Sequence, residues 1–557
     1  MSFASNELVF LPLGGSGEIG MNANLYHYND RWLMVDLGIS FPDETMPGID
    51  VVLPDISYIE ARKNKLEGLI LTHAHEDHFG AIPYLWERLG VPIYGTAFTL
   101  ALLRRKLAEN RTAFKIPMHE IDFNIDYQFG PFSVELIALN HSIPDPAALA
   151  VRTPEGTVLH TGDWKFDETP LLGTDTDRDR LRAIGDEGVL ALIGDSTNAM
   201  VPGRTPSEKV ARDGLTTVIS QAEKAVAITC FASNVARIRS IISAAQENHR
   251  SVCVVGRALN RTIDAAREVG YLKDIPDFVS ESDVGLMPRE NLVIICTGSQ
   301  GEPRAAMSRI AAGAHETVAL ERGDTVVYSS RQIPGNEPAI AKVQDMLIRR
   351  GILLVTDEDA PVHVSGHPAR DELVELYGLV RPKIAIPVHG TARHLQAHAK
   401  LAETCQVSQT LIPDNGSKIR LQNSEAEIVG HALVGLLTHE GGEIIDLQDN
   451  VLRARRRMLW NGTVTVTVLL NGAGDLVLAP AITQSGLCQD DRADDYLADC
   501  ANRVEDMLDD MPIKQRKNDQ AIEEVVQGAA RGLAKKMFRL RPTVHVQVMR
   551  AHATEIS

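Results

Sequence analysis

Short apolar runs separated by amphipathic stretches dominate the chain. Near the N-terminus, residues 8–13, 24–28 and 32–35 are apolar or alternate between apolar and polar side chains. This periodicity predicts three strands in succession before the first helix. Such an order is typical of the edge of a β-sandwich and not of a βαβ unit. Strand and helix segments then continue to about residue 163.

Between residues 207 and 350 the pattern becomes regular. Short apolar strands alternate with helical stretches, which predicts a parallel α/β domain. Candidate site residues resume after it, so we expect this domain to be an insertion. The strands are expected at 226–230, 252–255, 292–296 and 325–328, and the helices at 234–247, 257–269, 302–313 and 337–350.

The last part of the chain predicts a small α+β domain without a catalytic cluster. It follows a polar stretch, 421–457, which ends in an arginine run and for which we expect a solvated linker. The domain is expected to contain a hairpin with strands at 464–470 and 475–478, helices at 492–509 and 518–537, and a final strand at 543–548.

Composition limits the class of protein. At 557 residues the chain is too long for one core, so we expect about two to four domains. The N-terminus lacks a signal-peptide pattern, no apolar run is long enough to cross a membrane, and six scattered cysteines suit free thiols. We therefore expect a cytoplasmic protein that does not contact a membrane. The net charge of -18 argues against nucleic-acid binding over the whole surface, but it allows a local basic channel.

The strongest candidate site is the segment Thr72–His78, which follows the apolar run 69–71 and precedes a helix expected at 79–89. His73 and His75 are two residues apart in extended chain, so their imidazoles face one side. Asp77 and His78 lie beyond the bend, so one segment can serve two adjacent metal ions. Imidazole and carboxylate groups without a nearby cysteine favour zinc or manganese.

A glycine pattern near the N-terminus resembles a dinucleotide-binding fingerprint. Gly15, Gly17 and Gly20 satisfy G-x-G-x-x-G after a strand, and Asp36 lies near the expected acidic position. That fingerprint should open a helix, whereas the residues that follow predict strands. We therefore do not expect a dinucleotide site.

Further polar candidates follow apolar strands elsewhere in the chain, as the 73–78 segment does. Each alone would be an ordinary turn residue. Their shared position at strand ends makes a common site the better interpretation. They are His141, Asp163, Asp195 and His389, together with the H-x-S-G-H segment His363–His367.

Together these motifs resemble those of a known enzyme superfamily. The H-x-H-x-D-H motif, followed by His141 and Asp163, is similar in order and kind to the motifs of the metallo-β-lactamase superfamily of binuclear metal hydrolases. A domain of this kind that is interrupted by an α/β insert, with Asp195, His367 and His389 as extra motifs, resembles the β-CASP family, whose members act on nucleic acids.

Within that family the chain resembles the ribonuclease J family. The resemblance covers residues 7–420 and departs from the family at Met21, where a basic residue is expected. It rests also on the segments Gly14–Asn22, Thr297–Pro303, His363–His367 and Pro387–Gly390.

The resemblance implies an α/β fold: a metallo-β-lactamase αββα sandwich, an inserted parallel α/β β-CASP domain and a small C-terminal α+β domain. The family links such a C-terminal domain to subunit association, so we expect a homodimer or homotetramer. The expected boundaries are 1–206 and 351–420 for the two parts of the metallo-β-lactamase domain, 207–350 for the insert, 421–457 for the linker and 458–557 for the C-terminal domain.

The resemblance also implies two divalent metal ions per chain, zinc in the first place, with manganese or magnesium as alternatives for activity. Such a pair activates a water for in-line attack on a phosphodiester. The 3′ oxygen leaves, so the products carry a 5′ phosphate. We assign His73, His75 and His141 to one ion, Asp77, His78 and His389 to the other, and Asp163 as the bridge.

Other residues are expected to act on the substrate. His367 is the candidate general acid for the leaving oxygen, and Asp195 would hold its tautomer. Glu76 is left out of the ligand set, because in this motif its position points away. Candidate substrate-binding groups are Ser233, Asn234, His363, Ser365 and Gly366.

The resemblance implies a ribonuclease of RNA maturation and decay that works 5′→3′ on single-stranded, 5′-monophosphorylated RNA, with additional endonuclease activity and with other RNA-decay proteins as partners. Three alternatives stay open: another β-CASP member, which would be a nuclease acting on DNA or a pre-mRNA-type endonuclease; a small-molecule metallo-hydrolase such as a lactonase; and a non-catalytic RNA-binding scaffold. The insert and the H-x-S-G-H segment argue against the lactonase, and the complete ligand set argues against the scaffold.

Overall fold

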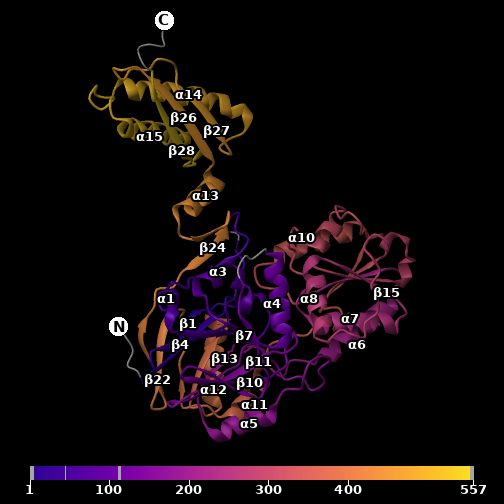
Figure 1. Ribbon diagram of the computed structural model, residues 1–557. Helices are drawn as coiled ribbons and strands as arrows, with labels where there is room; N and C mark the ends of the chain where they lie inside the picture. Colours follow the sequence, from indigo (N-terminus) through magenta and orange to yellow (C-terminus); the bar gives the residue numbers. More distant parts are fainter. Residues whose placement is uncertain (1–5, 44, 111–114, 552–557) are drawn as a thin grey trace. The chain divides into compact units, whose positions relative to one another are not determined.

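The computed structural model describes residues 6–43, 45–110 and 115–551 (Figure 1). The chain divides into two compact units, Met1–Phe41 with Val51–His439, and Pro42–Asp50 with Glu440–Ser557. None of the six cysteines, all of which lie in the described residues, forms a disulfide, as predicted, and four of them are buried. Among the described residues, no helix is both long enough and apolar enough to cross a membrane.

Two sheets packed face to face form the body of the first unit. Their strand orders are β23-β22-β1-β3-β4-β6-β7-β8 and β21-β19-β13-β12-β11-β10-β9. Buried side chains from both sheets, among them Phe10, Tyr26, Leu149 and Ile386, form one core between them. The strands are β1 Leu8–Gly14, β3 Ala23–Tyr28, β4 Arg31–Val35, β6 Leu66–Ile70, β7 Ile93–Gly95, β8 Met118–Glu120, β22 Ser417–Gln422, β23 Glu425–His431, β9 Asp126–Phe129, β10 Phe132–Ala138, β11 Ala147–Thr153, β12 Gly156–His160, β13 Val189–Asp195, β19 Ile384–Val388 and β21 Gln409–Thr410.

Helices cover the outer faces of this sandwich. A second apolar core joins the seven-stranded sheet to α5 (Arg178–Glu187), α11 (Arg370–Val380) and α12 (Ala392–Thr404). On the other side, α4 (Ala97–Glu109) contacts β7 and β8. The αββα sandwich predicted from the sequence is confirmed.

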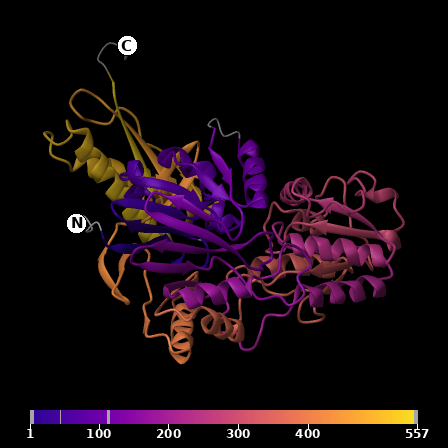
Figure 2. The same ribbon diagram turned by 60° about the horizontal axis from the view of Figure 1, so that its bottom comes forward.

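The insert is a parallel five-stranded sheet in the order β15-β16-β14-β17-β18, with helices on both faces (Figure 2). The predicted strands and helices all occur, although α9 is shorter than expected because residues 298–305 form a loop. The fifth strand lies beyond residue 350. The elements are β14 Val226–Thr229, β15 Ser251–Val255, β16 Leu292–Cys296, β17 Thr325–Tyr328, β18 Leu353–Val355, α6 Glu208–Gln221, α7 Val235–Glu247, α8 Arg257–Glu268, α9 Ala306–Ala311 and α10 Glu337–Arg349.

The linker predicted over 421–457 is wrong in its first part. Strand β23 pairs with β22 at the edge of the first sheet, and β24 (Leu436–Glu440) pairs with β5 (Val52–Pro54). These edge strands bury few of their residues, so they look polar in the sequence. The arginine run lies on a helix, α13 (Asn450–Asn461).

In the second unit, the helices α14 (Asp490–Asp509) and α15 (Asp519–Phe538) share an apolar core with a sheet in the order β27-β26-β28. Strands β26 (Thr463–Leu470) and β28 (Thr543–Arg550) match the predictions. The predicted hairpin partner at 475–478 is wrong, because β27 is Ala481–Ser485 and the earlier segment forms only a bridge at Leu476. The Asn471 side chain accepts hydrogen bonds from three successive backbone N–H groups, those of residues 473–475, and so stabilises a turn there. Leu478, at the end of the predicted strand, is exposed.

Candidate metal centre

The ligand segment begins in the turn after β6 and ends in the first of two short helices. The helix predicted at 79–89 is divided into α2 (Glu76–Phe79) and α3 (Ile82–Leu89). The loop after β4 supports this turn, since Leu37 N–H donates to His78 O and Ile39 N–H to Glu76 O. Gly38 lies so close that a Cβ there would be 1.7 Å from Asp77 O. Only glycine allows this loop to hold the segment in place.

Two of the three groups of donor atoms found in the described residues contain the predicted ligands, and they share one carboxylate; the third group joins Asp163 and His389 to Asp195 and His367. In each group the atoms lie within 4.8 Å of one another. Both groups are mostly buried and combine imidazole with carboxylate, which suits a divalent metal ion. The groups are His73, His75, His141 and Asp163, and Asp77, His78, His389 and Asp163.

Hydrogen bonds fix which ring nitrogen of each histidine faces the first group. His141 Nδ1 donates to Gly366 O at 2.5 Å, and His73 Nδ1 lies 3.1 Å from Thr72 Oγ1. Both therefore present Nε2, and each Nε2 lies 3.1 Å from His75 Nδ1. Burial lowers the pKa of His75 to about 4, and burial also lowers the pKa of His73 and His141. Neutral imidazole is the form that binds a metal ion.

In the second group, His78 and His389 are oriented by residues that the sequence analysis did not assign to the site. His78 Nδ1 donates to Asp36 Oδ2 at 2.7 Å, so its Nε2 faces Asp163 Oδ1 at 3.3 Å. His389 Nδ1 lies 3.2 Å from Asn22 Oδ1, and its Nε2 lies 3.7 Å from Asp77 Oδ2.

The glycine segment that imitates a dinucleotide fingerprint supports this second group. No helix follows it. Instead, β2 (Ser16–Gly17) pairs with β20 (Gly390–Thr391), and Gly15 O accepts a bond from His389 N–H. The strands predicted after this segment are confirmed, in place of the helix that a dinucleotide fingerprint opens.

Asp163 is a buried carboxylate that belongs to both donor groups. Its Oδ1 lies 3.3 Å from His78 Nε2, but it forms no hydrogen bond of good geometry with any described residue. Burial alone would raise the pKa of this carboxyl, but the surrounding His389 and His78 lower it well below its usual range. A buried, ionised carboxylate with a bare oxygen fits a bridging metal ligand.

His367 lies beside the cluster with one nitrogen engaged. Its Nδ1 donates to Asp195 Oδ2 at 2.8 Å, while Thr197 N–H donates to Asp195 Oδ1. Burial opposes protonation, but the charges of Asp195 and Asp163 raise the pKa of His367 to about 9. Cations at Asp163 would remove part of that attraction. The ring packs against both donor groups, edge-on to His141 and stacked on His389.

The H-x-S-G-H segment is held against this site by many bonds. Ser365 Oγ accepts from Asn198 Nδ2 and from His367 N–H. A Cβ at Gly366 would lie 2.6 Å from the His141 ring, so the residue's size permits its contact with that ligand. His363 Nδ1 lies 3.2 Å from Nη1 of the buried Arg237.

Two predicted phosphate contacts, Ser233 and Asn234, lie at the start of α7 in the insert and outside both donor groups. The Asn234 side chain is buried and caps the helix by accepting from Arg237 N–H at 2.8 Å. It therefore has a structural partner already, while Ser233 is partly exposed.

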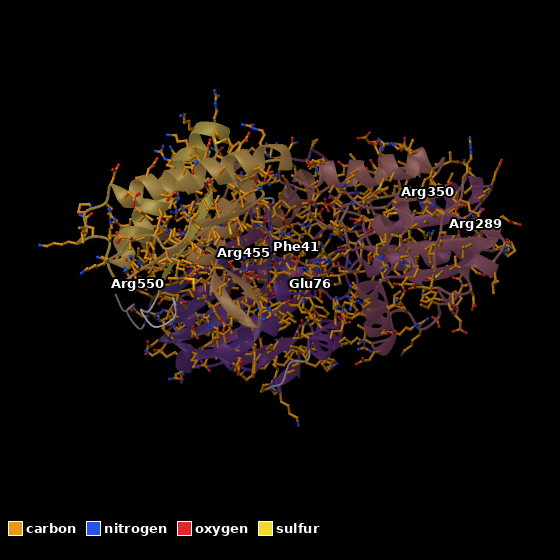
Figure 3. All side chains as sticks on the ribbon, turned by 90° about the horizontal axis from the view of Figure 1, so that it is seen from above. Phe41, Glu76, Arg289, Arg350, Arg455 and Arg550 are labelled. Atoms are coloured by element: carbon orange, nitrogen blue, oxygen red, sulfur yellow. The ribbon has the colours of Figure 1, made fainter. Side chains whose placement is uncertain are left out.

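Glu76, labelled in Figure 3, belongs to the ligand segment, but its carboxylate is in neither donor group. It forms an ion pair with the buried Lys106 of α4, and its Oε1 lies 3.7 Å from Arg261 Nη2 of α8. Arg261 also pairs with Glu109. The carboxylate thus ties the ligand turn to the insert.

The sequence analysis missed four residues that position side chains of the site: Asp36, Asn22, Lys106 and Arg237. Asp36 carried a usable signal, because a charged residue directly after the buried strand β4 requires a partner. The other three gave none, since their partners lie far away in the sequence.

Four family models match the chain. They are described as metallo-beta-lactamase superfamily (residues 17–203), ribonuclease J beta-CASP domain (223–347), Zn-dependent metallo-hydrolase RNA specificity domain (360–411) and ribonuclease J C-terminal domain (450–551).

Curated relatives match over nearly the whole length. The chain is 43% identical to ribonuclease J of Sinorhizobium meliloti over 97% of both chains. It is 40% identical to ribonuclease J of Mycolicibacterium smegmatis, over 96% of this chain and 95% of the relative. A crystal structure of a protein of unknown function from Enterococcus faecalis V583 matches 74% of this chain and 100% of its own, with a TM-score of 0.52 and 18% identity. That likeness concerns the fold alone.

Proposed function

The chain belongs to the ribonuclease J family, and from that premise we propose that it is a metal-dependent ribonuclease whose site holds two divalent ions. The observation that carries this proposal is the pair of donor groups joined by Asp163. A small-ester hydrolase would not account for the family models of the insert and the C-terminal domain.

The residues fit two cations, zinc in the first place, with manganese or magnesium as alternatives for activity. The first ion would be held by His73, His75 and His141, the second by Asp77, His78 and His389, and both by Asp163. When bound, such a pair neutralises phosphate charge and lowers the pKa of a water to about 7. Asp36 and Asn22 hold the rings of the second set in place for this purpose.

His367 is the general acid in this proposal. Asp195 engages its Nδ1 and so keeps the proton to be donated on Nε2. That proton goes to the 3′ oxygen as its bond to phosphorus breaks, and the product keeps a 5′ phosphate. Asp195 is the orienting residue, because one of its oxygens binds the imidazole while the other accepts from Thr197 N–H.

The H-x-S-G-H segment would bind substrate phosphate. Ser365 uses its oxygen as an acceptor, so its hydroxyl proton is available to a phosphate. His363, whose Nδ1 lies 3.2 Å from the Arg237 guanidinium, is the second candidate contact in this segment. Gly366 and Ser233 would contribute backbone or hydroxyl contacts. Asn234 would act indirectly, because its side chain caps α7, the helix that carries Arg237.

The match to the RNA specificity domain supports RNA as the partner. We propose single-stranded, 5′-monophosphorylated RNA as the preferred substrate, 5′→3′ exonuclease activity with additional endonuclease activity, and a homodimer or homotetramer in the cytoplasm, working with other RNA-decay proteins. These finer points follow from the family to which the chain belongs.

The test is a cleavage time course on one RNA carrying a 5′ monophosphate, triphosphate or hydroxyl, with manganese and with chelator. We expect mononucleotides first from the monophosphate form, and no products with chelator. Internal fragments independent of the 5′ end would make the enzyme chiefly an endonuclease. Cleavage of DNA but not RNA would overturn the proposal.

Two variants connect that assay to the site. Asp77→Ala should abolish cleavage, whereas Asp122→Ala, at an exposed aspartate, should not change it. His367→Ala should slow cleavage by about 100-fold or more while the metal content stays the same. An unchanged rate in His367→Ala would remove this residue from the mechanism.

A further inference from the structure

The helix α13 carries an exposed surface that nothing in the proposed reaction uses. Its sequence contains four arginines and no acidic residue. Two of the arginines have partners in the second unit. Arg455, labelled in Figure 3, pairs with Glu440, and Arg456 Nη2 donates to Leu447 O at 3.0 Å. The apolar side of the helix is used as well, because Leu452 is buried.

The other two arginines share a face with a tryptophan. Arg453, Arg457 and Trp460 are spaced by four and three residues, so they fall within about 60° of one another around the helix. We call these three residues the Arg–Trp stripe. Arg453 and Arg457 are exposed, and no described residue forms an ion pair with either of them.

Trp460 is 72% exposed, although an indole stabilises a fold only when it is buried. The local charge also makes the stripe unusual. The next helix, α14, carries eight acidic and two basic residues, and the whole chain has a net charge of -18. The two arginines without an ion-pair partner and the exposed tryptophan therefore stand out locally, because the chain around them is acidic.

We propose that the Arg–Trp stripe is a second contact site for single-stranded RNA, separate from the metal centre. The two guanidinium groups would pair with phosphates, and a base would stack on the indole, which is how single strands are bound without regard to sequence. This inference rests on the proposed function, which supplies RNA as the polyanion. Its consequence is tighter binding of long RNA than of RNA that fills only the catalytic site.

The experiment uses the full chain in chelator, so that RNA is bound but not cut. Affinities for a labelled 5-nucleotide and a labelled 30-nucleotide RNA are measured at several salt concentrations. Trp460→Ala should weaken binding of the long RNA by roughly tenfold, and Trp460→Phe should restore most of it. Arg453→Gln with Arg457→Gln should lower the salt slope by about 1.4, because each phosphate contact contributes about 0.7. The short RNA should bind all variants equally.

The matched control is Arg503→Gln with Arg541→Gln, which removes two exposed arginines from the same unit. It should leave affinity and salt slope near those of the wild type. Equal losses in both double variants would show a general charge effect and overturn the proposal. A change of oligomeric state in Trp460→Ala, with unchanged RNA affinity, would also overturn it and make the stripe a protein interface. Manganese-dependent cleavage of the short RNA by the wild type tests the proposed function independently.

Discussion

Asp36 lies outside both donor groups, yet its contact decides which nitrogen of His78 faces Asp163. Its Oδ1 accepts from Thr72 N–H at 2.8 Å, and its Oδ2 accepts from Thr72 Oγ1 and His78 Nδ1. Asp36→Asn would replace one acceptor oxygen by a donor and remove the charge. Because such orienting contacts are typically worth 10- to 100-fold in metal affinity, we expect about that loss, measured by competition with a chromophoric chelator.

The control for this change is Asp30→Asn, at an exposed aspartate that pairs with Lys65 on the surface. Its metal affinity should equal that of the wild type. Circular dichroism and thermal unfolding of both variants separate a local effect from loss of the fold. Wild-type metal affinity in Asp36→Asn would show that His78 keeps its orientation without this carboxylate.

Arg237 joins four elements in the interior of the first unit. Its guanidinium donates to both oxygens of Glu208 from α6, to Ser329 after β17 and to Val362 O. Arg237→Met would leave Glu208 buried without a counter-charge. We expect a loss of about 3–5 kcal/mol in the free energy of unfolding, measured with urea.

A double variant, Arg237→Met with Glu208→Met, should lose less than the single one, since no uncompensated charge remains. Lys209→Met breaks an exposed pair with Asp213 on the same helix and should cost less than about 1 kcal/mol. Similar losses in Arg237→Met and Lys209→Met would mean that the guanidinium network does not stabilise the insert.

Elements buried on both faces could be predicted from the sequence, and edge elements could not. The predicted strands of the insert are continuous apolar runs, so their positions along the chain could be predicted from the sequence pattern alone. β23 and β27 alternate or are largely exposed, and their pairing depends on turn geometry. The residues of the two donor groups could be predicted to lie together, because they follow strands whose ends meet at one edge. Asn22 and Lys106 were not, because their partners His389 and Glu76 come from distant segments.

At the scale of the whole molecule, every donor atom of the metal centre belongs to the first unit, while the second unit has its own core. Two units with separate cores should unfold in two calorimetric transitions. The candidate donor groups lie in the first unit, so a metal ion held there at 100 times its dissociation constant should add about 2.7 kcal/mol to the stability of that unit. Chelator should therefore lower one transition and leave the other unchanged.

A variant in the second unit provides the reciprocal experiment. Tyr496 is fully buried there, and its hydroxyl donates to Ala530 O. Tyr496→Ala should cost about 3–5 kcal/mol, as large-to-small changes of aromatic core residues do, and should lower only the transition that chelator leaves unchanged. Leu478→Ala, at an exposed position of the same unit, should move neither transition. If chelator and Tyr496→Ala lowered both transitions together, the two units would fold as one, and metal binding would stabilise the C-terminal domain as well.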